Sequence, residues 1–100
     1  MKTTIQEIDG KLVATLSGEL DTAASQETQE ALQPLLNSEG KDIVIDCTEL
    51  EYIASSGLRI FLSILKQAKA VGSRVVLKNV NEVVRDVLEL TGFVSIFEFE

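Results

Sequence analysis

The sequence predicts an α/β protein with the element order ββαβαβαβ, and two observations lead to this class. Residues Thr3 to Ile8 and Lys11 to Leu16 alternate between polar and apolar side chains, and Asp9-Gly10 between them is a typical hairpin turn. After this hairpin, short apolar runs alternate with stretches of helical composition. The alternation predicts a mixed, partly parallel sheet joined by right-handed crossovers.

The first helix is expected within "ELDTAASQETQEALQPLLN", which follows Gly18. Asp21 or Thr22 can accept hydrogen bonds from the free N–H groups of its first turn. Pro34 should bend or shorten the helix near its C-terminal end, because proline cannot donate to the carbonyl four residues back.

A central strand is expected in "KDIVIDC", because a short apolar run between polar residues is typical of a strand covered on both faces. Residues Thr48 to Ala54 should then form a loop. The second helix should run from about Ser56 to Val71, and Gly72 can end it.

The C-terminal third predicts a strand, a helix and a last strand. "SRVVLKN" has the composition of a strand, and "NEVVRDVLELTG" predicts a helix capped by Asn81 and stopped by Gly92. "VSIFEFE" is a further strand candidate. The chain contains no internal repeat or flexible linker, so we expect one domain over residues 1–100.

The composition argues against several classes of partner. With 9 basic and 16 acidic residues, the net charge of −7 repels nucleic acid and anionic membranes. The single cysteine, Cys47, follows an apolar run, where a buried, reduced thiol is the usual occupant. The sequence shows neither a signal peptide nor an apolar run approaching the ~20 residues of a membrane span. We therefore expect a cytoplasmic protein with no nucleic-acid partner and no direct membrane insertion.

Ser55 and Ser56 precede the second helix, and Gly57 follows them. A serine at a helix start can cap the first turn for ~1 kcal/mol, which accounts for one hydroxyl. The second hydroxyl would then remain free beside the positive end of the helix dipole, where an added phosphate is favoured locally. Structural capping and a phosphorylation switch are both open on the residues alone.

The second helix has an apolar surface that covers about half of its circumference, wider than the stripe of an ordinary surface helix. Ile60 and Ile64 lie in the outer part of this surface. Either the third helix covers them, or they stay partly exposed and dock a partner.

Intrinsic catalysis is not expected. The chain has no histidine, so a serine nucleophile would lack its usual base, and "ASSGL" is not the nucleophile elbow of hydrolases. No phosphate-binding loop and no set of metal ligands is recognisable. The expected protein is a binding module without cofactor, metal or catalytic residues.

Three segments, "SGELDTA", "IVIDCTELEYIASSGLRIFL" and "LKNVNEVVRDVLELTGF", resemble the STAS domain of bacterial anti-sigma factor antagonists in order and spacing. The resemblance spans essentially the whole chain. It implies an α/β domain in which a mixed sheet carries helices mainly on one face.

The resemblance also implies a function. Members of that family bind an anti-sigma factor that is a serine kinase of the GHKL type, and so release a sigma factor. Phosphorylation of a loop serine turns the binding off, and a serine phosphatase restores it. By the family pattern, that serine is Ser55 here, with Ser56 as the second choice. The implied partner-binding residues are Asp21, Ser56, Gly57, Leu58, Ile60 and Ile64.

One position departs from the family pattern. Ala54 occupies the place of the aspartate that normally precedes the phosphorylated serine. This departure favours an alternative, in which the domain is a scaffold subunit of a lipid or anion transport system and has no phosphorylation cycle.

Overall fold

The computed structural model describes residues 1–100 and begins with the predicted hairpin. Strands β1 (Lys2–Ile8) and β2 (Lys11–Leu20) are antiparallel. Asp9 and Gly10 have φ values of 52° and 77°, as the two positions of a type I′ turn require. β2 continues four residues beyond the predicted end at Leu16, because Gly18 takes a φ of 110° where the register with the next strand shifts.

The prediction of a loop at residues 48–54 is wrong, because all but the last of these residues belong to a strand. β3 runs from Ile43 to Ile53, and only Ala54 separates it from the next helix. Two register shifts against β2 place extra residues in β3, so its buried side chains there recur every third position, at Cys47, Leu50 and Ile53. This spacing hides the strand from a search for alternating residues.

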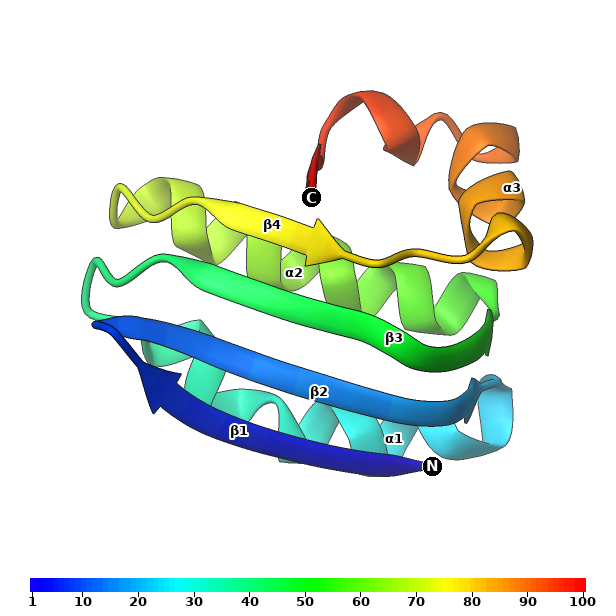
Figure 1. Cartoon of the computed structure of the whole chain (residues 1–100), viewed down its shortest axis with the longest axis horizontal. Coiled ribbons are helices and arrows are strands. Elements are labelled where there is room, and N and C mark those ends of the chain that lie inside the picture. The colour runs from blue at the N-terminus through cyan, green and yellow to red at the C-terminus, as the bar shows by residue number, and fades with distance from the viewer.

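The five strands lie in the sheet in chain order, β1-β2-β3-β4-β5. Only β1 and β2 are antiparallel; β3, β4 (Val75–Lys78) and β5 (Glu98–Phe99) continue the sheet in parallel. Since right-handed crossovers that all advance in one direction put their helices on the same face, the helices should share one side. Figure 1 shows α1 and α2 together behind the sheet, with α3 beyond the end of β4. The predicted mixed sheet with helices mainly on one face is confirmed.

Each predicted helix is present. α1 spans Thr22–Ala31 and is followed by the 3₁₀ helix η1 (Gln33–Asn37). Pro34 lies in the first turn of η1, where its missing N–H breaks no hydrogen bond within the helix. α2 spans Ser55–Ala70. The last predicted strand is mostly wrong, because Phe93–Ser95 forms a 3₁₀ turn, η2, and β5 keeps two residues.

α3 (Glu82–Leu90) is anchored to the sheet by its cap. The Asn81 side chain accepts a hydrogen bond from Val84 N at 2.8 Å and donates another to Leu50 O at 2.9 Å. One side chain thus satisfies the helix start and holds it against β3. Gly92, with a φ of 77°, follows the helix as expected for a left-handed C-terminal residue.

The hydrophobic core lies between the sheet and the helices. Ile60 and Ile64 belong to it, with 7% and 1% of their surface exposed, so the expectation of an exposed docking edge there is wrong. They line a small crevice together with Leu32 and Leu36. The covering element is therefore the α1–η1 segment, and not the third helix that the sequence had suggested.

Cys47 is fully buried, and burial together with the neighbouring Asp46 carboxylate raises the pKa of its thiol to about 12. Because this pKa is above the ordinary value of 9.0, the thiol stabilises the fold up to about pH 9. Above that pH the unfolded thiol ionises first, and stability should fall by about 1.4 kcal/mol per pH unit. Urea denaturation between pH 8 and 10.5 should show this decline, and a Cys47→Ala variant should lack it. Equal slopes in both proteins would contradict the assignment.

Candidate functional site

The N-terminal ends of α1 and α2 come together at one edge of the sheet. β2 and β3 are parallel, so their C-terminal ends, which lead into α1 and α2, lie side by side. The Ala54 N–H donates to Leu20 O at 2.8 Å and ties the two exits to each other. In the first exit, Asp21 caps α1 by accepting from Ala24 N at 2.9 Å, which confirms its expected capping role.

The two serines do not cap α2. The N-cap is Ala54, which offers no side-chain acceptor, and Ser55 and Ser56 form the first two helical positions. Ser55 is exposed, and its hydroxyl takes part in no hydrogen bond within the protein. The N–H groups of the first turn therefore have no side-chain acceptor from the N-cap, and the free Ser55 hydroxyl lies at the positive end of the helix dipole.

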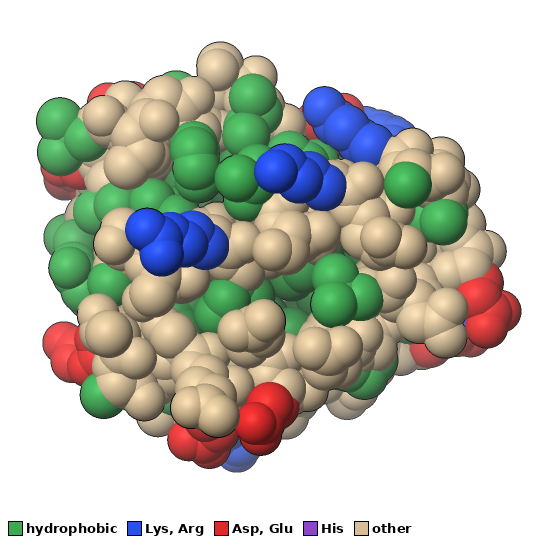
Figure 2. All heavy atoms as spheres, turned by 180° about the vertical axis from the view of Figure 1, so that it is seen from behind, with side chains coloured by type: hydrophobic (Ala, Val, Ile, Leu, Met, Phe, Trp, Pro, Cys, Tyr) green, Lys and Arg blue, Asp and Glu red, His purple; other side chains and the backbone are tan.

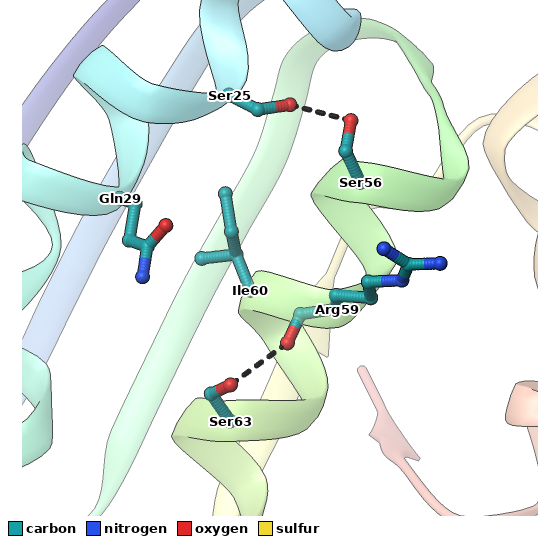
Figure 3. Close-up of a pocket in the computed structure, with 6 residues that line it drawn as sticks. All are labelled: Ser25, Gln29, Ser56, Arg59, Ile60 and Ser63. Carbon is teal, nitrogen blue, oxygen red and sulfur yellow. Dashed lines mark hydrogen bonds between the residues drawn. The ribbon is translucent and has the colours of Figure 1, made fainter.

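The Ser56 hydroxyl, by contrast, is committed to α1. Its Oγ lies 2.6 Å from Ser25 Oγ, as Figure 3 shows, and Ser25 Oγ in turn lies 2.8 Å from the Asp21 carbonyl. A carbonyl can only accept, so the single Ser25 proton goes to Asp21 O. Ser56 must then be the donor to Ser25, and its own proton is occupied. The two adjacent serines are thus chemically different.

Gly57 lets α2 approach the sheet closely. A Cβ at this position would lie 2.7 Å from Leu20 Cγ and 2.8 Å from Ile53 Cγ1. Leu58 is 2% exposed. Of the expected docking residues, Gly57 and Leu58 therefore lie buried in α2, and Ile60 and Ile64 are buried beside the α1–η1 segment. Asp21 and Ser56 are more accessible, and both are half-buried.

A pocket of about 230 Å³ opens between α1 and α2, one turn beyond Ser55. Figure 3 shows its lining of hydroxyl, amide, guanidinium and one apolar side chain: Ser25, Gln29, Ser56, Arg59, Ile60 and Ser63. Arg59 and Ser63 are exposed, and Ser63 Oγ donates to Arg59 O at 3.0 Å. Neither residue was predicted as functional from the sequence. The available signal was that α2 carries basic residues and no acidic one.

Asp46 on β3 has a carboxyl pKa below its ordinary value. The hydroxyl and the N–H of Thr48 donate to its Oδ1, at 2.5 and 3.0 Å, and chiefly the hydroxyl lowers the pKa of the carboxyl. Asp46 lines a hollow with Lys78, Val44 and Thr15, whereas the serine site is bounded by α1 and α2. Asp46 therefore does not contribute to the serine site.

The structure is thus an α/β domain with helices mainly on one face of the sheet and an exposed serine at the start of α2. The STAS domain family model matches residues 2–100, and the chain belongs to this family. No helix in the structure has the length and apolarity that crossing a bilayer would take.

Related proteins carry names of one functional class. BtrV of Bordetella bronchiseptica, named as a candidate anti-sigma factor antagonist, is 37% identical over 97 residues, which cover 97% of this chain and 84% of that protein. The anti-sigma-B factor antagonist of Listeria monocytogenes strain EGD-e is 31% identical over 85 residues, or 85% of this chain and 75% of that protein.

Solved structures agree on the fold. A candidate anti-sigma factor antagonist from Thermotoga maritima matches with a TM-score of 0.86 at 24% identity, covering 97% of this chain and 84% of that one. SpoIIAA in its unphosphorylated form matches with a TM-score of 0.81 at 22% identity, covering 99% and 88%. The phosphorylated form of SpoIIAA, a Bacillus cell fate determinant, matches with a TM-score of 0.74 at 21% identity, covering 99% and 91%.

Proposed function

We propose that this protein is an anti-sigma factor antagonist that acts in the cytoplasm. It binds an anti-sigma factor that is also a serine kinase of the GHKL type, and the sigma factor is thereby released. Phosphorylation of Ser55 ends the binding, and a serine phosphatase restores it. The names of the related proteins support the binding function, and the SpoIIAA structures support a phosphorylated state in this family.

The observation that carries the choice of serine is the difference between the two hydroxyls. Ser55 is exposed and free, whereas the proton of Ser56 is donated to Ser25 on α1. A kinase that removes a proton from Ser56 would first have to break this contact between helices. Ser55 is therefore the phosphorylated residue, and the Ser25–Ser56 contact holds the site together.

The chemistry needs no catalytic group from this chain. Ser55 Oγ attacks the γ-phosphorus of ATP, the bond to the β,γ-bridging oxygen breaks, and ADP leaves while a base of the kinase takes the hydroxyl proton. The product carries a charge of about −1.5 to −2 beside the first turn of α2, whose N–H groups and dipole favour it. That same charge opposes an acidic partner surface.

A scaffold function without a phosphorylation cycle is the second candidate, and Ala54 is the observation that favours it. A carboxylate at this N-cap would accept from the first-turn N–H groups, whereas alanine leaves them without a side-chain partner. Under this second hypothesis the domain is an unregulated scaffold subunit of a lipid or anion transport system.

Site-resolved mass spectrometry tests the proposal. The protein and its Ser55→Ala and Ser56→Ala variants are incubated with ATP and each GHKL-type kinase of the same organism. One phosphate on the wild type and on Ser56→Ala, but none on Ser55→Ala, is the expected result. If a kinase binds the protein tightly but transfers no phosphate, the switch is wrong and the scaffold reading takes its place.

A further inference from the structure

The exposed face of α2 is basic, although the whole chain is strongly acidic. Arg59, Lys66 and Lys69 are its charged residues, and no acidic residue occurs within the helix. The chain as a whole has 16 acidic residues against 9 basic ones. Figure 2 shows Lys and Arg side chains mostly across the upper half of the helical face and acidic side chains toward its margins. A basic helix face on an acidic protein favours an acidic partner segment.

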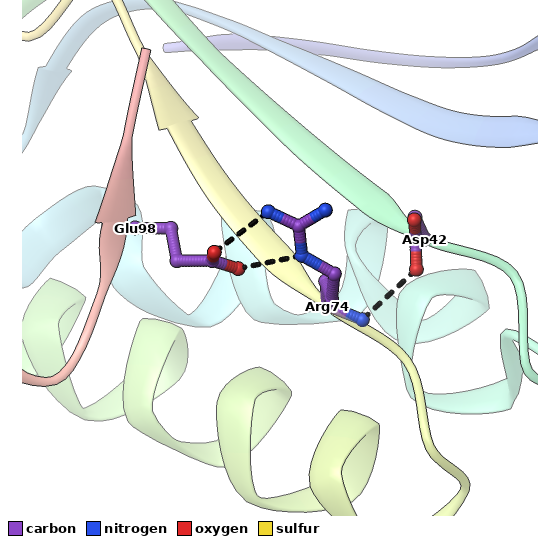
Figure 4. Close-up of polar contacts among 3 residues, drawn as sticks. All are labelled: Asp42, Arg74 and Glu98. Carbon is purple, nitrogen blue, oxygen red and sulfur yellow. Dashed lines mark hydrogen bonds and ion pairs between the residues drawn. The ribbon is translucent and has the colours of Figure 1, made fainter.

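Arg59 differs from the other arginines of the chain. Arg74 donates two hydrogen bonds to Glu98, at 2.7 and 3.0 Å (Figure 4), and Arg85 pairs with Glu89 at 3.6 Å and lies over the ring of Phe99. Arg59 has no ion pair, in spite of the excess of carboxylates. It adjoins the pocket between α1 and α2, whose lining contains hydroxyl and amide groups but no acid.

We propose that this pocket receives a carboxylate side chain of the anti-sigma factor through Arg59, and that a phosphate on Ser55 competes for the same guanidinium. The inference rests on the proposed function and deepens it by naming the chemistry of the partner. The planar guanidinium suits a carboxylate, because it offers paired donors to both oxygens. Ser25, Gln29 and Ser63 supply further polar groups in the lining of the same pocket.

The competition follows from the spacing along α2. Ser55 and Arg59 are four residues apart on one helix, the separation at which side chains lie as neighbours on the same face. Phosphoserine at an exposed helix start can therefore pair with the arginine one turn later. A single phosphate would then repel an acidic partner and also pair with Arg59, the residue that binds the partner's carboxylate. Phosphorylation of Ser55 would thus weaken binding in two ways.

The first arm of the test measures by calorimetry the affinity of the wild type and of two variants for the kinase. Arg59→Gln removes the charge, and its affinity for the wild-type kinase should fall about tenfold or more. Lys11→Gln is the matched control, because it removes one positive charge from a hollow bounded by strands, away from α2. Its affinity should stay within about twofold of the wild type. Equal losses in both variants, or none in Arg59→Gln, would overturn the docking assignment.

The second arm needs no kinase. Phosphoserine is installed at position 55 during translation, and ³¹P NMR follows the second ionisation of its phosphate. Pairing with Arg59 should lower this pKa by about half a pH unit relative to the Arg59→Gln variant. The same pKa in both proteins would overturn the competition.

The two arms separate the possible failures. If no kinase binds the wild type, the proposed function and the docking pocket both fail, while the NMR result still decides whether Arg59 holds a phosphate. If the kinase binds the wild type and phosphorylates Ser55, but Arg59→Gln binds the kinase as tightly, the proposed function stands. The assignment of the pocket as a carboxylate site is then wrong.

Discussion

Replacement of Gly57 by alanine is expected to lower the free energy of unfolding by about 1–3 kcal/mol. The added Cβ would lie 2.7 Å from Leu20 Cγ and 2.8 Å from Ile53 Cγ1, and neither side chain has any exposed surface into which it could move. In an ordinary helix the same change would be stabilising, because alanine has the higher helix propensity. The sign of the effect therefore reports the close approach of α2 to the sheet. Urea denaturation of both proteins measures it.

Two further variants make this prediction specific. Ser63→Ala introduces the same residue at an exposed position of α2 and should change stability by less than about 0.5 kcal/mol. Leu20→Ala removes the atoms nearest to the new Cβ, so Gly57→Ala should cost less in that background than in the wild type. Additive effects of Gly57→Ala and Leu20→Ala would show that the destabilisation does not arise from the contact with Leu20.

Ser55→Asp is expected to weaken binding of the anti-sigma factor kinase by about tenfold or more, because it places a fixed negative charge on the docking surface. Ser55→Ala should bind as tightly as the unmodified protein and should no longer respond to ATP. Both substitutions are at an exposed hydroxyl without hydrogen-bond partners, so neither should disturb the fold. Calorimetric titration of the kinase with each variant gives the comparison.

Ser55→Asn separates charge from shape. Asparagine has nearly the size of aspartate but no charge, and its affinity should stay close to that of Ser55→Ala. Equal binding by the aspartate and alanine variants would rule out an electrostatic switch at this position. Weak binding by both aspartate and asparagine would instead indicate a steric requirement for a small residue.

Those features of the fold that depend on local chemistry were predictable from the sequence. Asp9-Gly10 determined the hairpin, and Asp21 and Asn81 marked the starts of α1 and α3. Gly72 and Gly92, both with a φ of 77°, marked two helix ends. In each case the turn or helix end lies within about four residues of the side chain or glycine that forms it, so a short stretch of sequence is enough to predict it.

The remaining features depend on contacts between distant segments. β3 was predicted too short because its two register shifts arise only on pairing with β2. For Ile60 the sequence left open cover by the third helix or an exposed edge, because its cover by the α1–η1 segment is a matter of tertiary packing. The Ser25–Ser56 bond joins residues 31 positions apart, and nothing near either serine indicates the other. The candidate serines thus lie at the start of α2 as expected, whereas the burial of Ile60 and the contact between Ser25 and Ser56 could not be predicted from the sequence.

The order of the strands in the sheet has a consequence for how the chain acquires its structure. Every strand pairs with the strand that precedes it in the chain, and none has to insert between two strands that have already paired. As the ribosome releases the protein from its N-terminus, each new strand finds its partner already exposed at the growing edge. Early segments can thus be protected before later ones exist, which shortens the time that apolar edges are open to aggregation.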